Sequence, residues 1–284
     1  MKFDVTTADT SIGAAQYYQF CQKIEGQNMA HLEWGTSNAK SVTLSFWIRS
    51  NLTGTYNVYF LNNAVNRYHP VNFTIDSANT WEKKIITATG DTTGTWLTTN
   101  GIGMFLLWNL ALGSNNLTGT NATWGTAGAG VSGTTQANFL SSTSNELYIT
   151  GIQLEVGDKA TDFEHRSFGD ELARCQRYYQ RIQSNSTYDA LLDGMHHVTT
   201  QFYAMHTFPV QMRAEPTMAG SGTFVVLSNG SDRTPDSLIL NRATKEVIQT
   251  YSALSGGNVG VAGHGGQIRN NNDASTFIEF NAEL

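Results

Sequence analysis

Apolar and polar residues alternate along most of this chain, which is the pattern of β-strands buried on one side. The clearest case is residues 42–49, where every second position is apolar: Val42, Leu44, Phe46 and Ile48. Side chains of a strand point alternately to opposite faces, so the pattern predicts an antiparallel strand with these four residues in a core. The intervening Trp47 and Arg49 are then expected on the outer face.

Similar patterns predict further strands on both sides of one helical segment. Residues 56–61 follow a turn at 51–54 and are expected to form a hairpin with 42–49, and residues 101–112 are apolar on both faces, as in a central strand covered on both sides. In residues 147–156 the alternation slips at Gly151, which indicates a bulge. The other expected strands are residues 17–23, 71–75, 81–88, 197–208, 223–227, 238–240, 245–251 and 277–284.

One short helix is predicted near residues 168–177. Ser167 can cap it, and Asp170 and Glu171 lie in its first turn, where the helix dipole favours negative charge. Phe168, Leu172, Cys175 and Tyr179 recur at helical spacing as one apolar stripe. We therefore expect an all-β protein of two jelly-roll-like β-sandwich domains, residues 1–157 and 183–284, joined by a linker and short helix over 158–182.

Composition excludes several partners. Only 14% of the residues are charged, and 17 Lys and Arg against 23 Asp and Glu leave no basic stripe for nucleic acid. No apolar run is long enough to span a bilayer, and the first residues lack the apolar core of a signal peptide. Cys21 and Cys175 are too few for a disulfide framework or a zinc site, and we expect both to be buried thiols, with a single long-range bridge as the alternative.

Two regions rich in Gly, Ser, Thr and Asn, residues 115–144 and 255–272, are expected to be long surface loops. The first contains Gly128-x-Gly130-x-x-Gly133, which matches a dinucleotide-binding fingerprint. No helix follows it and no βαβ unit surrounds it, so we interpret the match as accidental.

The sequence offers no catalytic constellation. Its carboxylates are scattered singly, whereas glycan hydrolysis needs two that face each other across a cleft. Nucleophile-elbow, zinc-protease, Walker and EF-hand motifs are all missing. His197 and His206 fall on opposite sides of an alternating strand and are poorly placed to share a metal. We therefore expect no catalytic residue, no metal ligand and no cofactor.

Aromatic residues are the strongest functional signal. All six tryptophans lie between Trp34 and Trp124, and aromatic rings bind sugars by stacking on the apolar face of a pyranose while nearby amides and charged groups take the hydroxyls. Trp34, Trp81 and Trp108 are assigned to core or turn packing, whereas Trp47 should point outward. If strand alternation holds, a carbohydrate-binding sheet face is predicted at Trp47, Arg49, Asn57, Tyr59, Gln153 and Glu155. Instead of binding a glycan, this face is alternatively covered by another subunit or by the chain's own loops.

The region that holds the helix also resembles a known family. The strand IQLEVG, followed by ATDFEHRSFGDELARCQRYY, is similar to the junction of many tail fibre and tail spike proteins of tailed bacteriophages. The segments QKIEGQNMAHLEWGTSNAKSVTLSFWIRS, NTWEKKIITATGDTTGTWLTTNGIG and FPVQMRAEPTM resemble the same group. In that family a carbohydrate-binding-module-like jelly roll precedes a small C-terminal β-domain. The resemblance implies a homotrimer in the virion, made in the host cytoplasm, in contact with other tail proteins and a host surface glycan. It also suggests a structural calcium ion, which no carboxylate cluster in the sequence supports.

The function favoured by these observations is a non-enzymatic fibre or spike tip that recognises the host surface without inserting into a membrane. A polysaccharide depolymerase, either a glycoside hydrolase or a lyase, is the alternative, but its catalytic signature and long repetitive β-helix are missing. A purely structural fibre or capsid-decoration module is a third hypothesis. Because the chain begins close to its first strand, we expect either a short fibre protein or a fragment of a longer fibre.

Overall fold

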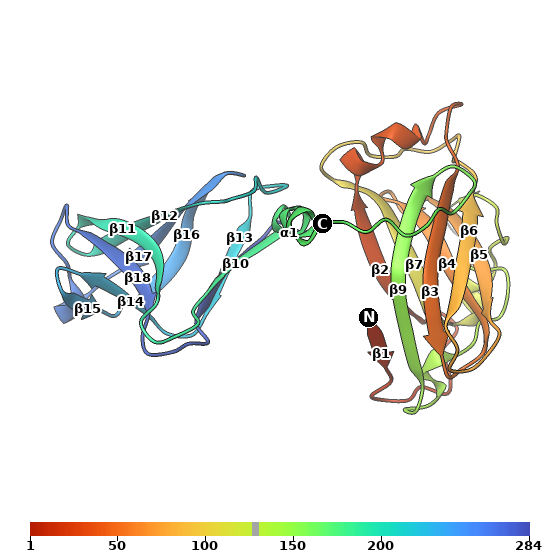
Figure 1. Ribbon diagram of the computed structural model, residues 1–284, viewed down its shortest axis with the longest axis horizontal. Coiled ribbons are helices and arrows are strands. Elements are labelled where there is room, and N and C mark those ends of the chain that lie inside the picture. Colours follow the sequence, from red (N-terminus) through yellow and green to blue (C-terminus); the bar gives the residue numbers. More distant parts are fainter. Residues whose placement is uncertain (127–130) are drawn as a thin grey trace. The chain divides into compact units, whose positions relative to one another are not determined.

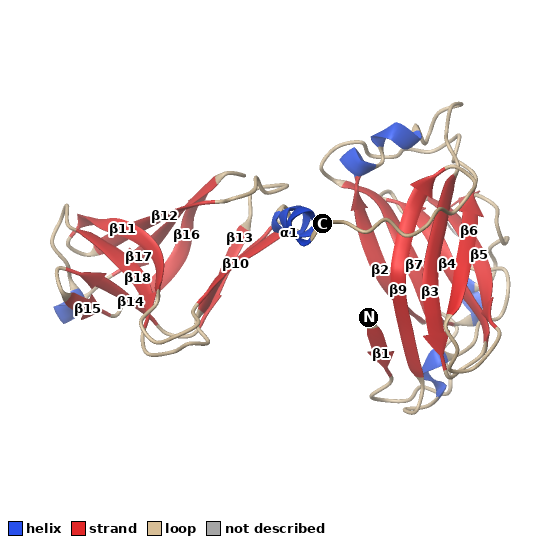
Figure 2. Cartoon of the chain, viewed as in Figure 1, coloured by secondary structure: helices blue, strands red, loops and turns tan. Residues whose placement is uncertain are grey.

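The computed structural model describes residues 1–126 and 131–284, and the chain forms two compact units (Figure 1). Residues 1–165 with Leu284 make the N-terminal unit, and residues 166–283 make the C-terminal unit. Both are built mainly of antiparallel sheets, which confirms the all-β, sandwich-like fold (Figure 2). The division falls between His165 and Arg166, whereas the sequence opens the second domain at residue 183.

The N-terminal unit is a sandwich of a four-stranded and a five-stranded sheet. The four-stranded sheet has the order β1 (Lys2–Asp4), β9 (Glu146–Val156), β3 (Val42–Ser50) and β6 (Glu82–Ala88). The five-stranded sheet has the order β2 (Tyr17–Glu25), β7 (Ile102–Leu112), β4 (Gly54–Asn62), β5 (Arg67–Ile75) and β8 (Gly125–Thr126). Single-turn 3₁₀ helices lie in the connections: η1 (Gly26–Asn28), η2 (Ala30–Leu32), η3 (Ser114–Asn116) and η4 (Phe139–Ser141).

The core of this unit lies between the two sheets and is filled by the inward-pointing residues of each strand. Leu44 and Phe46 on β3 face Phe60 on β4, and all three are fully buried, as the alternation predicts. The predicted bulge in β9 is confirmed: Gly151 has a positive φ of 59°, and the β3–β9 register shifts at this point.

Strand β7 is buried on both faces, as predicted for a central strand. Its outer face carries Leu107, which packs with Tyr59 and Tyr68 in a second apolar cluster, and Val131 packs against this cluster. The loop that leads up to Val131 is also bonded to the five-stranded sheet. The backbone N–H of Ala122 donates to the carbonyl oxygen of Pro70 on β5 at 2.7 Å. Residues of the chain's own long loop, within 114–126 and 131–136, therefore cover this face of β7.

The C-terminal unit packs a three-stranded sheet against a seven-stranded one. The small sheet has the order β10 (Tyr179–Gln183), β19 (Phe277–Asn281) and β13 (Thr217–Ser221). The large sheet has the order β15 (Ser231–Arg233), β14 (Phe224–Ser228), β18 (Gly265–Asn270), β11 (Ala190–Val198), β12 (Gln201–Thr207), β17 (Val247–Ala253) and β16 (Ser237–Ala243), with η5 (Gly256–Asn258) in a loop. Phe202 and Ile248 of the large sheet meet Ile278 and Phe280 of the small one in the core.

Two sequence interpretations of this unit were wrong. Residues 197–208 are not one strand, because the chain turns at 199–200 between β11 and β12. Residues 255–272 are not only a loop, because β18 pairs with both β11 and β14. The glycines that suggested a loop suit close strand packing: a Cβ at Gly266 would overlap the carbonyl oxygen of Leu227.

The predicted helix is confirmed as α1 (Phe168–Gln176), and the Ser167 hydroxyl accepts its capping hydrogen bond from the Asp170 backbone N–H at 3.2 Å. Tyr179, which the sequence added to the helical stripe, belongs to β10 instead. No residue of α1 is buried. Cys21 and Cys175 are both exposed, which contradicts the expectation of buried thiols.

Candidate functional site

The six residues predicted to bind carbohydrate do not form one surface. Trp47 and Arg49 on β3 lie with Gln153 and Glu155 on the four-stranded sheet, whereas Asn57 and Tyr59 lie on β4 of the five-stranded sheet. Although only a short turn separates β3 from β4, the two strands are not a hairpin, since β3 pairs with β6 and β9 while β4 pairs with β5 and β7. The outer faces of the two sheets point away from each other across the core.

Asn57 and Tyr59 are outward-pointing but covered. Asn57 lies in an amide ladder: its Oδ1 accepts from Asn109 Nδ2 at 2.8 Å, and its Nδ2 donates to Asn72 Oδ1 at 3.1 Å. Tyr59 donates its hydroxyl to Gln19 Oε1 at 2.9 Å, and burial raises the pKa of this tyrosine. Both side chains are therefore buried and join neighbouring strands, so neither is open to a ligand.

Gln153 and Glu155 bind the connector that follows β9. Gln153 Oε1 accepts from the backbone N–H of Glu164 at 2.7 Å, and Glu155 Oε2 accepts from that of Thr161 at 3.1 Å. Hydrogen bonds from Gln153 and Thr161 lower the pKa of Glu155. This amide and this carboxylate fix residues 158–165 over the sheet, which a sequence-based pattern of outward polar residues does not reveal.

Trp47 and Arg49 remain on an open face. Trp47 is 43% exposed, which confirms its outward direction, and Trp81, assigned by sequence to packing, is 42% exposed. Tyr148 on the neighbouring strand β9 has its ring 6.3 Å from that of Trp81 and 5.4 Å from the guanidinium carbon of Arg49. This face has exposed aromatic rings, but its polar groups are largely engaged with one another.

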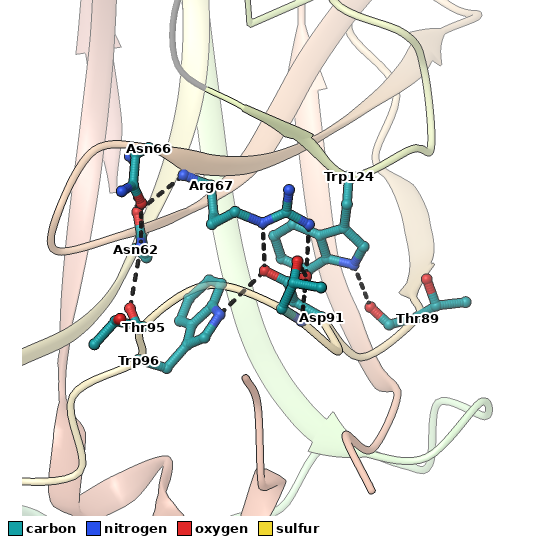
Figure 3. A network of polar contacts seen from close by, with 9 residues as sticks. Asn62, Asn66, Arg67, Thr89, Asp91, Thr95, Trp96 and Trp124 are labelled. Atoms are coloured by element: carbon teal, nitrogen blue, oxygen red, sulfur yellow. Dashed lines mark hydrogen bonds and ion pairs between the residues drawn. The ribbon is translucent and has the colours of Figure 1, made fainter. Parts of the chain in front are cut away.

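A polar network surrounds the buried Asp91 of the same unit (Figure 3). Arg67 forms a bidentate pair with Asp91, with Nε–Oδ2 at 2.8 Å and Nη2–Oδ1 at 2.6 Å, and Trp96 Nε1 also donates to Asp91 at 3.2 Å (Figure 3). Trp124 donates to the Thr89 carbonyl oxygen at 2.8 Å beside the Arg67 guanidinium (Figure 3). Burial opposes the ionisation of Asp91, but hydrogen bonds led by Arg67 lower its pKa overall. Because these groups satisfy one another, we interpret the network as structural.

The strongest candidate site is a groove of about 610 Å³ on the outer face of the seven-stranded sheet. It is lined by Asp193, Gly194, Met195, His197, Tyr203, Met205, Asn241, Arg242 and Gln249. Four adjacent strands, β11, β12, β17 and β16, supply these residues. The groove therefore crosses the strands of a rigid sheet, and alternation places its side chains on the face opposite the core.

Strand register arranges the groove in two rows. Met195 pairs with Tyr203, and Tyr203 pairs with Tyr251, whose ring centroid is 5.4 Å away. In the second row Asp193, Met205, Gln249 and Arg242 are successive partners across the same four strands. Met195 and Met205 are 50% and 57% exposed, so the apolar surface is open to solvent. An apolar, aromatic row thus runs beside a row in which Asp193, Gln249 and Arg242 supply hydrogen-bonding groups and Met205 is apolar.

The polar groups of the groove keep free hydrogen-bonding capacity. Asp193 Oδ1 accepts from Gln267 Nε2 at 3.2 Å, and Gln249 Oε1 accepts from Asn241 Nδ2 at 2.7 Å. Within the described part of the chain, Arg242 makes no hydrogen bond or ion pair. A planar guanidinium, a carboxylate and amides beside a tyrosine ring are the groups that orient a sugar, and the guanidinium suits a carboxylate or phosphate substituent.

The described residues offer few groups for catalysis or for binding a metal ion. Of the residues described as lining the groove, Asp193 alone carries a carboxylate, whereas glycoside hydrolysis uses two. Residues 1–126 and 131–284 contain no group of three or more His, Cys, Asp or Glu side chains that could hold a metal ion. They also contain no helix long and apolar enough to cross a membrane.

Sequence reasoning missed the groove because it followed tryptophan, and the C-terminal unit has none. A signal was present: the alternation of residues 201–207 puts Tyr203 and Met205 on one face. Of the glycine fingerprint, Gly128 and Gly130 lie outside the described residues.

Comparison with known proteins does not assign this chain to a family. No protein-family model matches the chain, and no curated protein matches it. Among solved structures, one similarity is to oxalate decarboxylase, in a structure concerned with an element that modulates proton-coupled electron transfer. It has 9% identity over the whole of this chain and 77% of that chain, and its TM-score of 0.12 supports no inference about fold or activity.

Proposed function

We propose that this protein is a non-enzymatic, glycan-binding component of a bacteriophage tail, and that the groove on the seven-stranded sheet takes the glycan. The observation that carries the proposal is the pairing of Met195 with Tyr203 beside the polar row that ends at Arg242. Apolar clefts with a few oriented polar groups are the usual form of small-ligand sites.

Each part of the groove has a function in this proposal. The Tyr203 ring stacks on the apolar face of a pyranose, beside the exposed side chains of Met195 and Met205. Asp193 and Gln249 accept hydrogen bonds from hydroxyl groups. Arg242 pairs with an acidic substituent of the same or the next sugar unit, so a glycan with carboxylate or phosphate groups fits better than a neutral one.

The virion setting rests on the sequence resemblance to tail fibres and spikes. In that setting the chain contacts other tail proteins and attaches the particle to a surface glycan of the host. A single groove carboxylate supports binding without bond cleavage. The homotrimer and the structural calcium ion stay predictions of the resemblance.

The test is calorimetric titration of the whole chain with fragments of host lipopolysaccharide, capsule and exopolysaccharide. Tyr203→Ala should abolish saturable binding, whereas Tyr203→Phe keeps the stacking ring and should keep most of the affinity. Trp47→Ala, which removes an exposed aromatic ring of the N-terminal unit, is the control. If Trp47→Ala loses binding and Tyr203→Ala keeps it, the glycan site lies on the four-stranded sheet instead of in the groove. Release of new reducing ends would contradict the absence of catalysis.

A further inference from the structure

Gly265 is exposed on β18, although nothing in the fold requires a glycine at this position. Among the described residues, a Cβ at Gly265 would meet only the carbonyl oxygen of Gly194, at 3.8 Å, which is an ordinary van der Waals contact. Gly265 also lacks the positive φ that favours glycine elsewhere in the chain. A glycine in a strand has no side chain to pack, and it often marks a place where a ligand approaches the backbone. Neither packing nor backbone conformation explains Gly265, which points to close approach by a ligand.

Gly265 lies at the end of the apolar row of the groove. It is the register partner of Met195, so a side chain here would stand on the same face of the sheet. From Met195 the row continues through Tyr203 and Tyr251 to Ile239 on the edge strand β16, and Ile239 is 50% exposed. We call Met195, Tyr203, Tyr251 and Ile239, one residue on each of four strands, the apolar track. The track ends on a glycine on one side and on the edge of the sheet on the other.

The spacing of the apolar track matches that of a linear glycan. Neighbouring strands lie about 4.8 Å apart, which is close to the length that one pyranose unit adds to an extended glycan. The ring centroids of Tyr203 and Tyr251 are 5.4 Å apart, so adjacent rings can hold adjacent sugar units. The two rings are tilted by 54° to each other, which suits a chain that twists from one unit to the next. The track thus offers one apolar support per sugar unit.

Hydrogen-bonding groups accompany the apolar track at both of its ends. On the side of Gly265, Gln267 on β18 is the register partner of Asp193 and donates to its Oδ1 at 3.2 Å. At the opposite end Arg242 lies on the edge strand beside Gln249. A glycan that runs the length of the track and passes over Gly265 therefore meets polar side chains along its edge.

We propose that the groove binds an internal stretch of a linear, acidic polysaccharide that lies across the strands, with one sugar unit on each, and that this polysaccharide leaves the groove over Gly265. A site for a chain terminus has a closed end, whereas this track ends on a glycine and on the sheet edge. The inference rests on the proposed function, because it takes Tyr203 as a sugar-binding ring. It adds that the glycan is recognised within its length.

The first experiment measures how binding depends on glycan length. The whole protein chain is titrated with intact host capsule and exopolysaccharide and with size-graded fragments from their partial hydrolysis. Affinity should rise with fragment length up to about four or five units, one for each strand from β16 across to β18, and then level off. Each molecule of intact polysaccharide should bind many protein chains, in proportion to its length.

The outcomes of this titration separate the two proposals. If each polysaccharide molecule binds one protein chain whatever its length, or if a disaccharide binds as tightly as a long fragment, internal recognition is wrong and the Tyr203 site remains. If no fragment shows binding that depends on Tyr203, both proposals are wrong.

The second experiment closes the exit with Gly265→Leu. Intact polysaccharide should then bind protein only at its chain ends, so fewer protein chains bind per molecule. A disaccharide should bind as it does to the wild type, which also shows that the groove is still folded. Gly257→Leu is the matched control, because Gly257 also has open space around it but lies in the loop at η5. Undiminished binding of intact polysaccharide by Gly265→Leu would overturn the proposed exit.

Ile239→Asn tests the other end of the apolar track and leaves β18 unchanged. Loss of this apolar support should weaken binding of fragments that span the groove by about fivefold, while disaccharide binding stays the same. An equal effect on long and short fragments, or no effect on either, would contradict a track that extends to β16.

Discussion

Tyr203 on β12 pairs directly with Tyr251 on β17, and their ring centroids lie 5.4 Å apart on the solvent side of the seven-stranded sheet. Because Tyr251 supports one side of the Tyr203 ring, the ring is fixed before a ligand arrives. A preformed aromatic surface loses little conformational entropy on binding, which favours affinity.

The polar end of the groove should determine which glycans bind. We expect Arg242→Ala to weaken binding of an acidic glycan by about tenfold or more, which corresponds to about 1.4 kcal/mol. Arg242→Lys keeps the charge but loses the planar bidentate geometry, so it should restore only part of the affinity. Titration of each variant with an acidic fragment and with its neutral, esterified form measures the effect. Equal losses for both forms would contradict recognition of the acidic group.

The ion pair between Arg67 and Asp91 should stabilise the N-terminal unit strongly. Asp91 is 1% exposed, so Asp91→Asn leaves the Arg67 charge without its partner and should lower the free energy of unfolding by about 3–5 kcal/mol. The matched control is Asp232→Asn, which breaks the more exposed pair with Arg269 in the C-terminal unit and should cost about 1 kcal/mol or less. Scanning calorimetry should show a large shift only for Asp91→Asn.

His69 should make the N-terminal unit sensitive to acid. Burial lowers the pKa of His69 to about 4, so between pH 6.5 and pH 4 the unfolded chain binds a proton that the folded chain does not. The free energy of unfolding should therefore fall by about 3 kcal/mol as the pH is lowered through this window. Tryptophan fluorescence during urea unfolding reports on this unit alone, because it holds all six tryptophans. His69→Gln should remove most of the decrease, and an unchanged pH profile in that variant would refute the assignment.

Close packing beside His196 should make Gly260 intolerant of a side chain. A Cβ at Gly260 would overlap the His196 imidazole, which is fully buried and bonded to Ser228 Oγ at 2.8 Å. We expect Gly260→Ala to destabilise the C-terminal unit by about 1–3 kcal/mol. Gly257→Ala, in the same loop with open space around the new methyl group, should have no comparable effect. Calorimetric melting of the two variants makes the comparison.

Local features of the sequence determined most of the elements. Alternation of apolar and polar residues identified β3 and its buried face, the apolar run at 101–112 identified central strand β7, and Ser167 with the following stripe identified α1. Gly151 identified the bulge because few other residues adopt a positive φ without strain. These signals succeed because they depend on neighbours within one strand or one helical turn.

Only the tertiary structure decided which strands share a sheet. The turn between β3 and β4 looks like a hairpin, but the chain passes there from one sheet to the other, and this separates Asn57 and Tyr59 from Trp47. Alternation predicts that a side chain points outward, but it does not reveal whether residues far along the chain cover it, as Val131 does at the cluster that contains Tyr59. The groove needs the register of β11, β12, β17 and β16, and only long-range pairing sets that register and so places Asp193 in line with Arg242.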